Sequence, residues 1–140
     1  MTVSAYKIFI CYGEEEHVDQ VDLVQQLNSA SGFAYTNTGS CSGEGIDRES
    51  LERNILRQIE DAAAVVVPSG MFLTYGFSRW VRFQVAHAKA FKRPIVVLTP
   101  HGSVGVPRYL KDYADKTLVW NGNPKWDASD LVDWIRALPN

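Results

Sequence analysis

The sequence predicts an α/β fold: a flavodoxin-like three-layer sandwich, in which a five-stranded parallel sheet of order 2-1-3-4-5 carries helices on both faces. Three observations support this prediction. Short apolar runs alternate along the 140 residues with segments of helical periodicity. The apolar runs are nearly uninterrupted, as in strands that are buried on both faces. The connections are short, which favours right-handed crossovers between parallel strands.

The first half of the chain is expected to form strand, helix, strand and helix. "KIFICY" (7–12) is a compact apolar strand, and 17–28 follows as a helix. The apolar residues of that helix have helical spacing: Val21, Val24 and Leu27. A short strand over 33–36 precedes 37–45, whose Gly, Ser and Asn residues indicate a loop. Asp47 can then cap a second helix. Its buried stripe has four-residue spacing: Leu51, Ile55 and Ile59.

The second half continues the alternation. "AAAVVVP" (62–68) is apolar throughout and is therefore predicted to be a central strand. A loop over 69–77 and a helix over 78–92 follow it. "PIVVLTP" (94–100) is the fourth strand, because proline at each end stops it. The remaining expected elements are a helix over 106–114, an edge strand over 116–120, and a closing helix over 127–138 that Asp127 can cap.

Composition and charge narrow the class of protein. A chain of 140 residues that is 46% hydrophobic suits one domain, residues 1–140, with its own core. A net charge of −2 argues against a nucleic-acid binder. No apolar run approaches the roughly 20 residues of a membrane span, and we recognise no signal peptide. Cys11 and Cys41 form neither a disulfide framework nor a metal-ligand spacing. We therefore expect a cytoplasmic protein that binds neither nucleic acid nor membrane.

The charged residues are unevenly distributed. The window from Ala62 to Lys111 contains no Asp or Glu. The same window holds seven basic residues: Arg79, Arg82, Lys89, Lys92, Arg93, Arg108 and Lys111. A solvated basic surface is the simpler interpretation of this distribution. The functional interpretation is a local positive field that suits a phosphate-bearing ligand.

Ligands of such sheets bind outside the carboxyl ends of the strands, near the switch point between strands 1 and 3. The candidate binding residues at this edge follow the first and third strands: Tyr12, Gly13, Ser69, Met71 and Tyr75. The edge has neither a P-loop nor a G-x-G-x-x-G motif, and no carboxylate follows the third strand as in a phospho-accepting domain. Three scattered histidines form no metal cluster.

The helix over 78–92 contains an amide where the period predicts burial. In "SRWVRFQVAHA" (78–88), Gln84 falls within the arc formed by the apolar residues Trp80, Val81, Phe83, Val85 and Ala88. A buried amide without partners costs roughly 1–3 kcal/mol, so Gln84 requires hydrogen bonds or a ligand.

Two segments resemble TIR domains. "YKIFICYG" is similar to their opening strand. "SRWVRFQVAHA", followed by "KRPIVVL", resembles the stretch Ser-x-Trp-Cys-x-x-Glu-x-x-x-Ala and the strand after it. The resemblance spans Tyr6 to about Trp120 and is nearest to the TIR-like proteins of bacterial Thoeris-type antiphage defence. It implies that NAD is a substrate rather than a cofactor. It also implies cleavage of the nicotinamide–ribose bond, with an ADP-ribose-derived product, cyclic or conjugated, as the immune signal.

The resemblance also implies roles for individual residues. The catalytic glutamate of enzymatic TIR domains falls on position 84, where this chain has Gln84. Trp80 would flank the nicotinamide or its ribose, and Tyr12 and Gly13 would approach the adenine-side phosphates or ribose. Tyr75 would belong to a mobile lid. Four residues have a structural and a ligand-binding interpretation. Asp47 is a helix cap or a ligand contact, and His87 is an inner histidine or a base. Trp80 and Tyr12 are either packing residues or ligand contacts.

Three interpretations of Gln84 are open. It is an introduced replacement for a natural glutamate that traps substrate, or the native residue of a non-catalytic TIR-like module, or an ordinary buried amide bonded to backbone. A carboxylate would stabilise the positive charge that develops on the ribose as the N-glycosidic bond breaks. At about 4 Å in an effective dielectric near 20, that interaction is worth roughly 4 kcal/mol, or about a thousandfold in rate. An amide lacks this charge but can still bind ribose hydroxyls.

Three functions are consistent with these observations. The first is an NAD-consuming enzyme whose diffusible product reaches a downstream effector, because the chain has no effector segment of its own. The second is a non-catalytic module that signals by TIR–TIR assembly and hence forms homo-oligomers. The third is a nucleoside deoxyribosyltransferase-like enzyme, which shares the fold and the need for an active-site glutamate.

Overall fold

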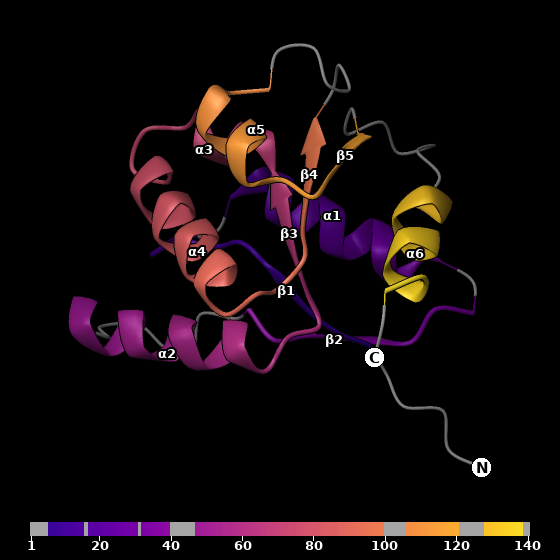
Figure 1. Cartoon of the computed structure of the whole chain (residues 1–140), viewed down its shortest axis with the longest axis horizontal. Helices are drawn as coiled ribbons and strands as arrows, with labels where there is room; N and C mark the ends of the chain where they lie inside the picture. Colours follow the sequence, from indigo (N-terminus) through magenta and orange to yellow (C-terminus); the bar gives the residue numbers. More distant parts are fainter. Residues whose placement is uncertain are drawn as a thin grey trace.

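The computed structural model describes residues 6–15, 17–30, 32–39, 47–99, 106–120 and 128–138. It contains a five-stranded, fully parallel sheet of order β2-β1-β3-β4-β5, as the sequence predicts (Figure 1). The strands are β1 (Tyr6–Ile10), β2 (Tyr35–Asn37), β3 (Ala64–Pro68), β4 (Ile95–Thr99) and β5 (Lys116–Val119). The helices are α1 (Val18–Asn28), α2 (Arg48–Glu60), α3 (Ser69–Phe72), α4 (Ser78–Ala90), α5 (Arg108–Tyr113) and α6 (Ser129–Arg136).

The sheet separates two hydrophobic layers. Alternate residues of one strand point to opposite faces, so Val65 and Val67 of β3 enter one layer whereas Val66 enters the other. The first layer is closed by α2, α3, α4 and α5, and the second by α1 and α6 (Figure 1). Every residue of β3 and β4 is buried, which explains why both strands are apolar along their whole length.

The helices bury the faces that their periodicity predicts. In α2, Leu51, Ile55 and Ile59 are all buried, and the Asp47 carboxylate caps the helix by accepting a hydrogen bond from the Ser50 N–H at 2.7 Å. The stripe expected in α1 is confirmed only in part. Leu27 is buried, whereas Val21 and Val24 are half-buried, and Leu23 completes the buried face.

Two expectations about local structure need comment. The segment 69–77 was expected to be a loop, but it begins with the one-turn helix α3, because Ser69 to Phe72 continue directly from the end of β3. Of the loop expected over 37–45, Asn37 is instead the last residue of β2, and residues 40–45 lie outside the described residues, as does Asp127. Ala128 precedes α6 and makes no side-chain cap. No helix in the described part of the chain is both long enough and apolar enough to cross a membrane.

Candidate functional site

The side chain of Gln84 forms two hydrogen bonds with the backbone of Tyr12. Its Oε1 accepts from the Tyr12 N–H at 3.2 Å, and its Nε2 donates to the Tyr12 carbonyl at 2.5 Å. Gln84 is 0% exposed. The amide therefore bonds to the backbone just beyond the end of β1, in the way that a neighbouring strand would. This position is the switch point between β1 and β3. The predicted burial of this amide is confirmed, and so is its bonding to backbone.

The arrangement suits an amide. Tyr12 offers one donor and one acceptor, and an amide side chain supplies the complementary pair in the same plane. An ionised glutamate would accept from the Tyr12 N–H but would place an oxygen against the Tyr12 carbonyl. A carboxylate at position 84 would thus lose one of the two bonds.

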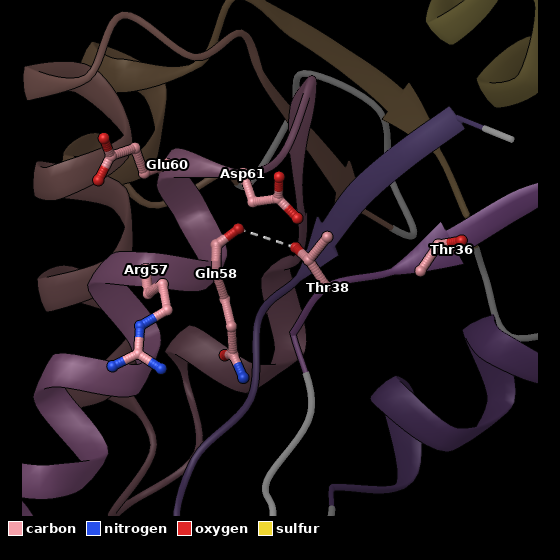
Figure 2. Close-up of a pocket in the computed structure, with 6 residues that line it drawn as sticks. All are labelled: Thr36, Thr38, Arg57, Gln58, Glu60 and Asp61. Atoms are coloured by element: carbon pink, nitrogen blue, oxygen red, sulfur yellow. Dashed lines mark hydrogen bonds between the residues drawn. The ribbon is translucent and has the colours of Figure 1, made fainter. Parts of the chain in front are cut away.

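The other side of Tyr12 extends this network toward α2. The Tyr12 hydroxyl donates to Gln58 Oε1 at 2.6 Å, and Thr38 Oγ1 donates to the Gln58 carbonyl at 2.9 Å. Gln58 also lines a pocket of about 700 Å³ between β2 and α2, shown in Figure 2. The residues lining that pocket are Thr36, Thr38, Arg57, Gln58, Glu60 and Asp61. Tyr12 itself is buried, so its aromatic ring is part of the core beside this pocket.

Gly13 lies against two aromatic rings. A β-carbon at this position would come within 2.9 Å of Phe77 Cδ1 and 3.6 Å of Trp80 Cδ1. Trp80 is only 2% exposed and packs edge-on against Phe83, with centroids 6.1 Å apart. The loop after β1 is therefore held tightly over the first turn of α4. The described residues bury the ring of Trp80, and its expected contact with a nicotinamide ribose stays a prediction.

A second polar network joins the same loop to the segment after α3. The Asp19 N–H donates to His17 Nδ1 at 3.0 Å, and His17 Nε2 lies 2.9 Å from Thr74 Oγ1. Because Thr74 Oγ1 donates to the Gly70 carbonyl at 2.8 Å, His17 must donate to it through Nε2–H. These contacts make Nδ1 the acceptor and Nε2 the donor of the His17 ring. His17, Asp19 and Thr74 are not among the predicted site residues, although His17 is a polar residue at the start of a predicted helix.

The remaining predicted site residues differ in how exposed they are. Ser69 and Met71 of α3 are buried, Met71 within the core layer of α2 to α5, and Tyr75 is 101% exposed. His87 is half-buried and satisfied within α4, where its Nδ1 lies 2.8 Å from the Phe83 carbonyl. This bond supports the structural interpretation of His87.

Asp47 is fully exposed at the start of α2. The hydrogen bonds from Ser50 hold the pKa of its carboxyl below the ordinary value. Its role as a helix cap is confirmed, and a contact with ligand stays a prediction.

The basic surface of α4 is built partly on aromatic rings. Arg82 stands 4.5 Å from the ring centroid of Tyr109 and 4.9 Å from that of Phe72. Arg79 lies 3.7 Å from Glu14 in an exposed ion pair. Among the residues that the structure describes, no group of three or more His, Cys, Asp or Glu side chains is placed to hold a metal ion.

Comparison with known proteins supports the fold. No family model and no curated protein matches the chain. The structure is similar to that of the CMP N-glycosidase BcmB from Clostridium botulinum, with a TM-score of 0.52 and 12% sequence identity over 93% of this chain and 97% of that one. A second similar structure is CapF bound to 3-isopropenyl-tropolone, with a TM-score of 0.38 and 14% identity over 81% of this chain and 29% of that one. At these identities, the likeness to BcmB concerns the fold.

Proposed function

We propose that this chain is a TIR-like domain that binds NAD or a related nucleotide at the carboxyl-end edge of the sheet. The reaction of this site is cleavage of the nicotinamide–ribose bond, which Gln84 strongly slows. The proposal is supported by the sequence resemblance and by a fold shared with an enzyme whose name describes cleavage of a nucleotide N-glycosidic bond. The product, derived from ADP-ribose, would carry a signal to a downstream effector.

The observation that carries the proposal is the position of Gln84. The residue on which the resemblance places the catalytic glutamate reaches the backbone just beyond β1, beside the switch point where ligands of such sheets bind. A carboxylate there cannot pair with the Tyr12 carbonyl. Repulsion by that oxygen disfavours the orientation that the amide adopts. The proposal requires the carboxylate to turn away from Tyr12, so that it can stabilise a cationic ribose.

The decisive experiment is Gln84→Glu. We expect the purified variant to release nicotinamide from NAD at a rate at least about a thousandfold above that of the unmodified chain. Gln84→Met serves as the matched control, because it also breaks the bonds to Tyr12 but supplies no charge. Nicotinamide is measured by liquid chromatography, and folding by circular dichroism. A folded Gln84→Glu variant that releases none, together with an unmodified chain that shows no calorimetric binding of NAD, contradicts the proposal.

A non-catalytic interaction module is the second candidate, and exposed apolar side chains favour it. Leu73 and Tyr75, after α3, are 70% and 101% exposed, and Val18 at the start of α1 is 66% exposed. The bond from His17 to Thr74 holds these two segments together. This function requires oligomers that form with increasing concentration and do not respond to NAD. Analytical ultracentrifugation with and without NAD separates the two functions.

A further inference from the structure

A second pocket lies at the amino-end edge of the sheet, away from Gln84. It has a volume of about 440 Å³, within the range of small-molecule sites, which starts near 300 Å³. Its walls come from the end of α4, the residues before β4 and β5, and the end of α6. The lining residues are Lys89, Lys92, Arg93, Pro94, Asp115, Trp134 and Leu138.

The cations of this pocket are poorly compensated. Within the described part of the chain, neither Lys89 nor Lys92 forms a salt bridge or a side-chain hydrogen bond. Arg93 donates from Nη2 to the Glu60 carbonyl at 2.6 Å, but its buried Nε has no partner among the described residues. Among the described lining residues, Asp115 is the one acid, and its Oδ2 accepts from the Ile95 N–H at 2.8 Å.

The position of Lys89 in the last turn of α4 explains part of this charge distribution. Cations near the last turn interact favourably with the helix dipole, and this accounts for Lys89. Lys92 and Arg93 follow the end of α4 and bring two further positive charges to the same pocket. A local excess of positive charge favours an anionic ligand.

The backbone conformation of Lys92 is a further feature of this pocket. Lys92 has a φ of +60°, and the Arg93 N–H bonds to the Ala88 carbonyl at 2.9 Å, so Lys92 occupies the left-handed position that closes a helix. Glycine is the favoured residue there, and a lysine is strained. Lys92 therefore brings a positive charge to the pocket from a position that glycine would occupy with less strain.

The remaining walls are apolar and partly aromatic. Trp134 of α6 is half-buried and lines the pocket together with Pro94 and Leu138. We propose that this pocket binds a small aromatic phosphate, with the phosphate on Lys92 and Arg93 and the ring against Trp134. The site is separate from the one at the carboxyl-end edge and does not depend on cleavage of NAD.

The test is a titration of the ¹⁵N-labelled chain with phenyl phosphate, inorganic phosphate and phenol, followed by NMR. We expect phenyl phosphate to shift the amides of 89–93 and the Trp134 indole in a saturable manner. Inorganic phosphate should bind at least about tenfold more weakly, since it lacks the ring. Phenol should cause no saturable shift. Absence of saturable shifts at these residues, or shifts confined to Tyr12 and Gln84, overturns the proposal.

Lys92→Gly separates binding from folding. Because glycine suits the left-handed conformation, this variant should keep or raise Tm while its affinity for phenyl phosphate falls at least about fivefold. Lys111→Ala removes an equal charge from α5, outside the pocket, and should leave the affinity unchanged. Equal affinities of Lys92→Gly and the unmodified chain, or equal losses in the two variants, overturn the assignment of the phosphate to Lys92.

Discussion

The contact between Gln84 and Tyr12 joins two segments that are 72 positions apart in the chain. Both atoms of the amide are used, and both backbone groups of Tyr12 are satisfied. The side chain thus holds the end of β1 against α4. Any function of this edge of the sheet depends on that contact, because Gly13 and the following loop begin there.

Replacing Gln84 by methionine should destabilise the protein. Methionine has a similar shape, but it removes both hydrogen bonds that the amide forms with the Tyr12 backbone. We expect the free energy of unfolding to fall by about 1–3 kcal/mol. Urea denaturation followed by tryptophan fluorescence measures the change. A loss below about 0.5 kcal/mol would mean that water reaches Tyr12 when the amide is absent.

Gln84→Glu should show a stability deficit that depends on pH. A buried carboxyl has a raised pKa in the folded state, and when protonated it can donate to the Tyr12 carbonyl as the amide does. The deficit should therefore be small below the unfolded pKa of about 4.3 and should grow as pH rises above it. Thermal unfolding at pH 4 and pH 8 checks this, with Gln84→Met as a control whose deficit is the same at both values.

Asp47 gives a pH dependence of the opposite sign. Its folded pKa is lowered, chiefly by the hydrogen bond from the Ser50 N–H, so its stabilising contribution is present above the unfolded value and is lost as pH falls through the folded value. Asp47→Ala should lower Tm at pH 7 and have little effect near pH 2. Asp47→Asn keeps a capping oxygen and should lower Tm less. Equal Tm differences at both pH values for Asp47→Ala would contradict this account.

Among the secondary-structure elements, α1 and the segment after α3 are linked by one hydroxyl. Thr74 accepts from His17 and donates to Gly70, so a single side chain completes both bonds. The ring of His17 also packs edge-on against Phe77, with centroids 4.8 Å apart. These contacts connect the start of α1 to the segment between α3 and α4.

Thr74→Val should loosen this link without changing side-chain shape. It removes both hydrogen bonds, and we expect a loss of about 1 kcal/mol in unfolding free energy together with faster amide exchange over 73–77. Thr74→Ser retains the hydroxyl and should behave nearly as the unmodified chain does. Unchanged exchange in Thr74→Val would show that packing on Phe77 suffices to order the segment.

For the molecule as a whole, the sheet should be most resistant to opening at its centre. The residues of β3 and β4 are all buried, whereas β2 and β5 form the edges and are partly exposed. Native-state hydrogen exchange should therefore be slowest in β3, β4 and the buried end of β1, and fastest in β2 and β5. Equal protection of β2 and β3 would contradict the expected ordering.

Local patterns were sufficient to predict the strands, most of the helices and the burial of Gln84. Those features follow from period and apolar content, which each segment carries in its own residues. The strand expected at 62–68 and the cap at Asp47 are examples, because neither needs knowledge of a distant partner. The strand order and the two helix layers followed from the alternation of strands and helices together with the rule for parallel crossovers. The helical turn α3 escaped prediction because four residues are too few to show a period.

The hydrogen-bond partners of the polar side chains could not be predicted from local patterns. Periodicity gives the direction in which Gln84 points, but only the crossover of the chain brings Tyr12 to it. The same holds for His17 and Thr74, and for the pocket that gathers Lys92 and Trp134 from separate helices. Hydrogen bonds and pockets depend on distances between remote segments, and those distances exist only once the sheet has assembled.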